Sequence, residues 1–367
     1  MKVPFLDLKL IYEDLREEYE KDVLSLMQSG YYIGGDKVSK FEQEYAQYSE
    51  ADYCVGVANG LDALKIALRT ININHGDEII VPSHTFIATW LAVTECGGIP
   101  VPVEVCPDTF NIDIDRIENS ITNKTKAILP VHLYGQPANL DAICNLANKY
   151  NLYVIEDAAQ AHGAKYKGKK IGSHGHIVAW SFYPGKNLGA FGDAGGITTN
   201  DKLLADKARV IGNYGSEKKY INDIAGFNSR LDPIQAVVLS TKLKHLDRYN
   251  SRRNEVAKAY LENLDIDGVV LPKVIDNVNP VWHLFCVKLK NRDQIQSKLK
   301  EYGIETLIHY PIPPHLQNAY KYLNFFNGSL PTAEGISESV LSLPISPIIS
   351  DEEVQYVIDI LKKLIIN

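Results

Sequence analysis

The stretch "YCVGVANGLDALKIALRT" (residues 53–70) decides the fold class. Its first part, residues 53–58, is a short apolar run that predicts a buried β-strand. Asn59 and Gly60 then open a segment with apolar residues at helical spacing, which predicts a helix over 59–70. A strand followed directly by a helix is typical of a βαβ unit, so this stretch predicts an α/β protein with a parallel sheet.

The same alternation continues through most of the chain. Further strands are predicted at 77–82, 99–105, 126–134, 152–159, 176–183 and 195–199, with helices over 85–97 and 139–150. A single long helix over 232–264 leads into a region with its own strand and helix patterns. We therefore expect a large α/β domain, residues 1–245, with an N-terminal helical segment and a mostly parallel central sheet, and a smaller C-terminal α+β domain, residues 246–367.

The composition excludes several classes of function. The 367 residues are 45% apolar and 23% charged, which is ordinary for a soluble globular protein. The 38 basic and 45 acidic residues give a net charge of −7, so neither nucleic acid nor an anionic membrane is a predicted partner. The five cysteines form no CxxC pair, and no apolar run approaches the length of a membrane span. These features favour a cytoplasmic protein without disulfides.

Residues at the predicted strand ends are candidates for a binding site, because ligands of open α/β sheets bind beyond the carboxyl ends of the strands. Asn59 and Gly60 open a helix whose free N–H groups suit a phosphate. A tight turn with an Asn cap is the simpler explanation of that pair taken alone. Phe86, Asp157 and Ser181 follow other strands, and each taken singly is explained by packing or by capping of a helix.

Lys186 is harder to explain by packing. It stands in "SFYPGKNLGAFGDAGG" (residues 181–196), beyond a predicted strand and among small residues, and lysine is rarely buried without a partner. A phosphate cup, a stacking ring, a carboxylate and a lysine amine are together what pyridoxal phosphate needs. Lys186 would form the Schiff base, with its pKa lowered by burial or neighbouring charge. Asp157 would keep the ring nitrogen protonated, so that the ring acts as an electron sink.

Four motifs then carry a family resemblance. They are "PSHTFIAT" (82–89), "VIEDAAQAHGAKYKGKKIG" (154–172), "SFYPGKNLGAFGDAGG" (181–196) and "GFNSRLDPIQA" (226–236). Together they resemble the sugar aminotransferases of the DegT/DnrJ/EryC1/StrS family, and the resemblance covers nearly the whole chain. It implies the type I, aspartate-aminotransferase-like fold of pyridoxal-phosphate-dependent transferases, and a homodimer whose active sites lie at the subunit interface.

The resemblance also implies roles around the cofactor ring. Lys186, in "FYPGKNLG", is similar to the Schiff-base lysine of the family. Asp157, in "EDAAQAHG", corresponds to the partner of the pyridine nitrogen. Gln160 in the same run corresponds to the residue that contacts the ring hydroxyl, and Phe86 to the aromatic residue that lies over the ring.

At the phosphate end, the resemblance implies backbone N–H groups from Gly60 and Leu61 and a hydroxyl from Ser181. Asn228 of the partner subunit would reach the same phosphate. The chain departs from the commoner family pattern in "NGLDAL", where many members carry Ser or Thr after the glycine. It also has "GAFGDAGG" where many members have "GEGG", so that Asp193 stands one position before the usual glutamate.

The loop around the lysine indicates a substrate. Members that act at C4 of the sugar usually carry "SFH" or "SFF" before the lysine and "TTGEGG" after it. The form "SFYPGKNLGAxGDxG" is similar to the branch that aminates C3 of thymidine-diphosphate (dTDP) 3-keto-6-deoxyhexoses. Tyr183 would place a phenol near the sugar, and Gly185 would leave room beside the lysine. The implied product is a dTDP-3-amino-3,6-dideoxyhexose for a surface glycan or natural product, with glutamate as amino donor leaving as 2-oxoglutarate.

Two further segments supply candidate substrate contacts. "HYPIPPHLQNAY" contains His309, Tyr310 and His315, which would contact the sugar or the nucleotide. Ordinary loop-packing histidines are an equally good explanation of its two histidines. Tyr214 and Lys219, in "NYGSEKKY", would meet the nucleotide across the subunit interface, unless this stretch is simply a solvated charged loop.

Other functions remain open at this point. A C4 aminotransferase would use the same framework, whereas a dehydratase of the family has histidine in place of Lys186. A non-catalytic regulator should show a broken lysine, aspartate or phosphate position, and none is broken here. We expect no metal site, because the histidines form no HxxxH pair and "HGH" (174–176) lacks a nearby third ligand. We also expect no nicotinamide site, because "VANGLDAL" is not a GxGxxG motif.

Overall fold

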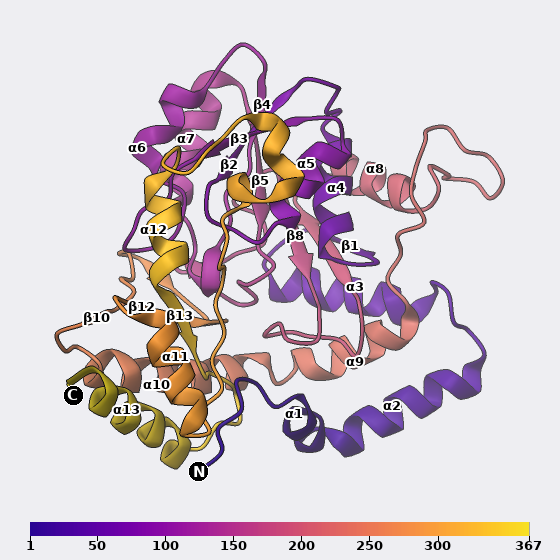
Figure 1. Ribbon diagram of the computed structural model, residues 1–367. Coiled ribbons are helices and arrows are strands. Elements are labelled where there is room, and N and C mark those ends of the chain that lie inside the picture. The colour runs from indigo at the N-terminus through magenta and orange to yellow at the C-terminus, as the bar shows by residue number, and fades with distance from the viewer. Residues whose placement is uncertain (367) are drawn as a thin grey trace.

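The computed structural model describes residues 1–366 and is an α/β protein with a seven-stranded central sheet (Figure 1). The strand order is β1-β9-β8-β5-β4-β2-β3. The bounds are β1 (Tyr53–Val57), β2 (Glu78–Pro82), β3 (Ile99–Val103), β4 (Thr125–Ile128), β5 (Tyr153–Asp157), β8 (Ile177–Ser181) and β9 (Gly195–Thr199). Strand β9 runs antiparallel to both of its neighbours, and the remaining pairs are parallel. The prediction of a mostly parallel sheet is thereby confirmed.

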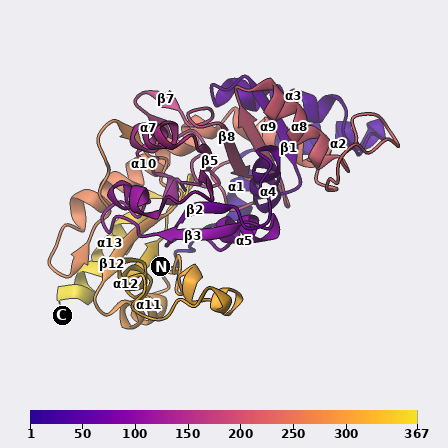
Figure 2. The ribbon, with the colours of Figure 1, turned by 90° about the horizontal axis from the view of Figure 1, so that it is seen from above.

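Helices cover both faces of this sheet. In β8, Ile177 and Ala179 pack into one apolar cluster, while Val178 and Trp180 pack into another on the opposite face. This alternation follows from the two-residue period of a strand, and burial on both faces explains why these strands are apolar throughout. Figure 2 shows α3 and α9 on one side of β1 and β8, with α4 and α5 on the other.

The helices and short strands of this part of the chain have the following bounds. They are α1 (Leu8–Asp14), α2 (Arg16–Ser29), α3 (Asp36–Tyr48), α4 (Gly60–Thr70), α5 (Ala88–Glu95), α6 (Ile114–Ile117), α7 (Leu140–Tyr150), β6 (Lys165–Tyr166), β7 (Lys169–Lys170), α8 (Lys202–Gly212) and α9 (Pro233–Leu243). Strands β6 and β7 form a small sheet with β11 (Val278–Asn279).

The C-terminal part contains a separate three-stranded sheet with the order β10-β12-β13. Its elements are α10 (Leu246–Asn263), β10 (Val269–Val270), β12 (Phe285–Leu289), α11 (Arg292–Glu301), α12 (Pro331–Ser339), β13 (Val340–Leu343) and α13 (Asp351–Ile366). Val3, near the N-terminus, belongs to the core of this part and exchanges backbone hydrogen bonds with Gly303 and Glu305. The boundary at residue 245 stays a prediction, and residues 1–245 do not all pack with the large sheet.

Two predicted elements differ from the structure. The strand expected over 126–134 ends at Ile128, and Pro130, which has no N–H to donate to a ladder, follows closely. The long helix expected over 232–264 is two helices, α9 and α10, which are separated at Lys244 and His245. The apolar spacing continues across this break, so periodicity alone does not reveal it. Within residues 1–366, no helix has both the length and the apolar character that crossing a membrane requires.

Candidate active site

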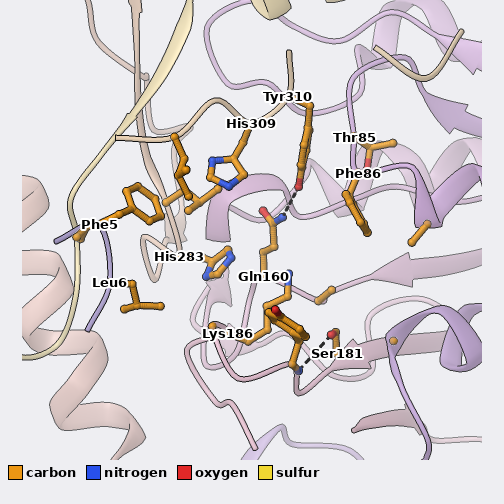
Figure 3. Close-up of a pocket in the computed structure, with 18 of the residues that line it drawn as sticks. Phe5, Leu6, Thr85, Phe86, Gln160, Ser181, Lys186, His283, His309 and Tyr310 are labelled. Atoms are coloured by element: carbon orange, nitrogen blue, oxygen red, sulfur yellow. Dashed lines mark hydrogen bonds between the residues drawn. The ribbon is translucent and has the colours of Figure 1, made fainter. Parts of the chain in front are cut away.

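A cavity of about 1210 Å³ lies where the carboxyl ends of β5 and β8 meet the start of α4 and the C-terminal part of the chain. Parallel strands bring their carboxyl ends to one edge of a sheet, which is why residues far apart in sequence meet here. Figure 3 shows several of the lining side chains converging on this space. The predicted residues that line it are Gly60, Leu61, Phe86, Asp157, Gln160, Ser181, Tyr183, Lys186, His309 and Tyr310.

Lys186 lies in the loop after β8. Its backbone N–H donates to the carbonyl of Tyr183 across 2.8 Å, which forms a turn that carries the side chain to the pocket. Burial lowers the pKa of Lys186 to about 8, while the negative charge of Asp157 acts in the opposite direction. A larger fraction of unprotonated amine is therefore present near neutral pH, and that form is the nucleophile.

Asp157 is the last residue of β5, and its carboxylate is held at both oxygens. Thr89, on α5, donates its hydroxyl to Oδ2 across 2.9 Å, and the Ala159 N–H donates to Oδ1 across 3.2 Å. Burial raises the pKa of Asp157, and these two hydrogen bonds and the charge of Lys186 oppose that rise. Thr89 lies within the motif "HTFIAT" but is not among the site residues predicted from the sequence.

The start of α4 forms one end of the pocket. Asn59 caps this helix, its Oδ1 accepting from the Asp62 N–H across 2.8 Å, which leaves the N–H groups of Gly60 and Leu61 at the first helical positions. A Cβ at position 60 would lie 2.5 Å from the Cβ of Ser181, so only glycine permits this close approach. Unpaired N–H groups, the positive end of the helix dipole and a serine hydroxyl together suit a phosphate group.

Two aromatic residues and a glutamine line the opposite wall. Phe86 is 53% exposed, and its ring centroid lies 5.6 Å from that of Tyr310. Gln160 accepts from the Tyr134 N–H at Oε1 and donates to the Tyr310 hydroxyl from Nε2, across 2.6 and 3.1 Å. Its amide is thereby oriented, and the second hydrogen on Nε2 is left for a bound group.

Comparison with known proteins decides the family. The profile of the DegT/DnrJ/EryC1/StrS aminotransferase family matches residues 13–362. The chain belongs to this family.

Characterised members of the family are similar over almost the full length. The chain is 51% identical, over 97% of its length and 98% of the relative's, to the dTDP-3-amino-3,6-dideoxy-alpha-D-galactopyranose transaminase of Aneurinibacillus thermoaerophilus. It is 49% identical, over 99% and 96%, to the dTDP-3-amino-3,4,6-trideoxy-alpha-D-glucose transaminase of Streptomyces venezuelae. The crystal structure of S. venezuelae DesV in complex with a ketimine intermediate superposes with a TM-score of 0.98, at 48% identity, covering 100% of this chain and 99% of that one.

In this aminotransferase the C-terminal part adds pocket residues that sequence reasoning missed. His283, which precedes β12, and Arg253, on α10, both line the cavity. The Arg253 guanidinium is buried and donates from Nη1 to the carbonyls of Trp282, His283 and Ile345. The available signal was a histidine inside the apolar run "WHLFCVKL" (residues 282–289).

Four predicted residues lie outside the pocket lining of the single chain. Asn228, Tyr214 and Lys219 lie in the segment between α8 and α9, where Asn228 Oδ1 accepts from Arg230 across 2.8 Å. His315 is buried, and its Nε2 lies 2.9 Å from Glu334 Oε1. Packing therefore explains its position in the single chain, and the substrate contact stays a prediction.

Across residues 1–366 there is no cluster of three or more His, Cys, Asp or Glu side chains arranged to hold a metal ion.

Proposed function

We propose that this protein transfers an amino group to C3 of a dTDP-3-keto-6-deoxyhexose, with pyridoxal phosphate as cofactor. One observation carries the proposal. A lysine with a lowered pKa and a buried aspartate share one pocket in a chain about half identical to enzymes named as dTDP-3-amino-sugar transaminases.

The pocket residues fit the functional groups of the cofactor. Gly60, Leu61 and Ser181 form a cradle that a Cβ at position 60 would fill, and this cradle suits the phosphate. Phe86 offers an exposed ring face for stacking, and Gln160 offers a free amide hydrogen to a ring hydroxyl. When bound, pyridoxal phosphate supplies an aldehyde that condenses with amines and a ring that withdraws electrons from the substrate carbon.

Lys186 acts as the general acid and base in this mechanism. With a pKa of about 8, its Nζ is poised to take a proton and to return one near neutral pH. We assign to Nζ the delivery of a proton to the keto carbon of the sugar, which carries no hydrogen before it receives nitrogen, and the removal of the α-hydrogen of the amino donor. Because the loop after β8 fixes Lys186 by a backbone turn to Tyr183, the amine stays within the pocket when it is released from its covalent bond.

Asp157 supplies negative charge at the ring nitrogen. Its two hydrogen bonds and the nearby positive charge of Lys186 counter the rise in its pKa that burial causes. A cationic N–H placed against it would favour the ionised carboxylate further. Asp157 thus holds a proton on the partner nitrogen, and water is kept away because the carboxylate is buried.

The sugar is proposed to lie beside Tyr183, His309 and Tyr310. Tyr183 is 58% exposed, and its hydroxyl is available to a ligand. A Cβ at Gly185 would make only ordinary contacts, at 3.7 Å to Leu6 and 3.8 Å to the Tyr183 ring, so this position leaves space next to Lys186. The amino donor is proposed to be glutamate, on the strength of the family resemblance, and the product to serve a surface glycan or a natural product.

A homodimer is proposed because apolar residues are exposed on two segments that project from the same side of the molecule. In the connection after α2, Tyr31 is 75% and Ile33 63% exposed, and Tyr220, after α8, is 87% exposed. Figures 1 and 2 both show α2 and the loop that follows α8 projecting from the same side of the molecule. Exposed apolar side chains on one side of the molecule favour association, and a dimer formed there would bring Tyr214, Lys219 and Asn228 of the partner subunit to the active site. We also propose a cytoplasmic location.

The test is a side-by-side assay of dTDP-3-keto- and dTDP-4-keto-6-deoxyhexoses, in gluco and galacto configurations, with glutamate and with other amino acids as donors. We expect turnover of a 3-keto sugar with glutamate, and a product that NMR identifies as the 3-amino sugar. A C3 enzyme must bind the hexose displaced by one C–C bond, about 1.5 Å, from its position in a C4 enzyme. Misplacement near 1 Å lowers the rate by about a hundredfold, so the 4-keto sugar should be a poor substrate. Preference for the 4-keto sugar would support the C4 alternative, and no turnover of any ketone would support a regulator.

A further inference from the structure

A chain of buried amides runs beneath the lysine loop. Asn250 donates from Nδ2 to the backbone carbonyl of His162 across 2.8 Å, and its Oδ1 accepts from Asn187 Nδ2 across 2.9 Å. Asn187 Nδ2 also donates to the carbonyl of Val281 across 2.9 Å. Because backbone carbonyls only accept hydrogen bonds, the orientation of both side-chain amides is fixed.

The fixed amide of Asn187 in turn fixes a histidine. With Nδ2 committed to Asn250 and Val281, the Asn187 Oδ1 faces Nδ1 of His283 across 3.2 Å. An amide oxygen only accepts, so His283 must carry a hydrogen on Nδ1. A neutral imidazole has one N–H, and therefore Nε2 of His283 is a lone-pair acceptor.

His283 stays neutral in this environment. Burial lowers its pKa well below 6.5, and the positive charges of Lys186 and Arg253, with His309 and His162, lower it further. Burial and the charge of Lys186 likewise lower the pKa of His309, to about 4, and burial, Lys186 and Lys242 lower that of His162, to about 3. Burial and neighbouring positive charge are the leading causes of the shift of the His283 pKa, and both disfavour its protonation.

Figure 3 shows His283 in the pocket between Lys186 and His309. We propose that His283 is a positioning residue whose Nε2 accepts a hydrogen bond from Nζ of Lys186 and so aims the amine for proton transfer. This inference rests on the proposed function only in taking Lys186 as the reacting amine. Asn187 acts indirectly, because it sets the tautomer of His283.

The arrangement explains why the lysine loop is joined to the C-terminal part of the chain. Lys186 and Asn187 are adjacent in sequence, and Asn187 is only 4% exposed. Asn187 contacts Val281 and His283 on one side and Asn250 on the other. A shift of the C-terminal part would therefore move the acceptor and the lysine loop together, which preserves their relative geometry.

The first test is nitrogen NMR of the histidines in the full-length protein, with His283 assigned by comparison with His283→Gln. We expect a neutral ring with hydrogen on Nδ1 and no titration between about pH 6 and 9, given the unperturbed histidine pKa near 6.5. In Asn187→Leu, where no acceptor faces Nδ1, the Nδ1–H form should lose its dominance. A wild-type spectrum with hydrogen on Nε2, or a ring that titrates in this range, would overturn the proposal even if no variant folds.

The second test measures the pKa of Lys186 in cofactor-free full-length protein, from the pH dependence of trinitrobenzenesulfonate labelling of its peptide. An acceptor stabilises the ammonium form, so His283→Asn should lower the pKa of Lys186 by about one unit. Asn places its amide near the site of Nδ1, whereas Gln reaches the site of Nε2, so His283→Gln should keep the pKa near that of the wild type. Equal values in all three proteins would overturn the proposal.

These outcomes are separable from those of the proposed function. Borohydride reduction of the cofactor-loaded protein maps the lysine that bears the cofactor. If the label maps to Lys186 and its pKa is unmoved in His283→Asn, only the role of His283 is wrong. If the label maps to another lysine, the assignment of Lys186 as the reacting amine is wrong.

Discussion

Thr89 donates its hydroxyl to Oδ2 of Asp157 across 2.9 Å, and this bond joins helix α5 to the end of strand β5. The same hydroxyl oxygen lies 2.9 Å from that of Thr85. The carboxylate is therefore held in one orientation before any ligand binds. Its negative charge remains available to a cationic partner. An aspartate fixed in this way is suited to hold a proton on a ring nitrogen rather than to accept one itself.

Asp157→Asn should impair turnover far more than folding. The asparagine keeps the shape and an acceptor for Thr89 but has no charge to hold a proton on the cofactor. Loss of one charge-assisted contact in a dry site corresponds to about 3 kcal/mol of transition-state stabilisation, roughly a hundredfold in rate. Thr89→Val, which leaves the charge in place, should have a smaller effect. The measurement is kcat beside the thermal midpoint, and near-normal turnover by Asp157→Asn would refute the assigned role.

Lys186 should be the lysine that borohydride fixes to the cofactor. Lys186→Ala should lose both the fixed label and activity, because the other lysine that lines the pocket, Lys300, stands on α11 rather than in the loop after β8. Lys242 is the control for the effect of a lowered pKa alone. It is also buried, and burial with the charge of Arg253 lowers its pKa to about 7, but it does not line the pocket. Peptide mapping should find the label on Lys186, and a label on Lys242 would show that a low pKa matters more than position.

Gly60→Ala should weaken both folding and cofactor binding. The new Cβ would meet Ser181 at 2.5 Å, and overpacking of this kind costs about 1–3 kcal/mol. Gly335→Ala is the matched control, since Gly335 is exposed within α12 and a Cβ there meets nothing within 4 Å. Replacing that glycine should stabilise the helix by about 1 kcal/mol. Calorimetry with and without pyridoxal phosphate checks both, and equal behaviour of the two variants would show that the close approach at Gly60 is unimportant.

Asn228→Ala and Lys186→Ala should complement each other when mixed. If Asn228 serves the partner subunit's phosphate site, each homodimer is defective, while a mixed dimer contains one site free of both changes. Activity should return in part once subunits exchange, which differently tagged chains can report. Exchange without any return of activity would mean that Asn228 acts within its own subunit or does not act at all.

The sequence by itself determined the fold class and predicted ten of the residues that line the pocket. Apolar runs alternating with helical spacing predicted the strands and helices of the large sheet, because burial on both faces leaves a continuous apolar signal. The residues after those strands, among them Asp157, Ser181 and Lys186, had to converge because parallel strands end at one edge. The motifs around them identified the family, which the comparison confirmed.

Only the tertiary structure decided the partners of these residues. The bond from Thr89 to Asp157 and the amide chain from Asn250 to His283 join positions distant in sequence, and no local pattern encodes such pairings. Burial of His315 against Glu334 likewise depends on packing, since an exposed and a buried histidine look the same in a sequence. The local pattern fixes which backbone segments form, whereas side-chain hydrogen bonds and desolvation depend on which segments meet. That is why the amine of Lys186 was predictable and the acceptor proposed for it, His283, was not.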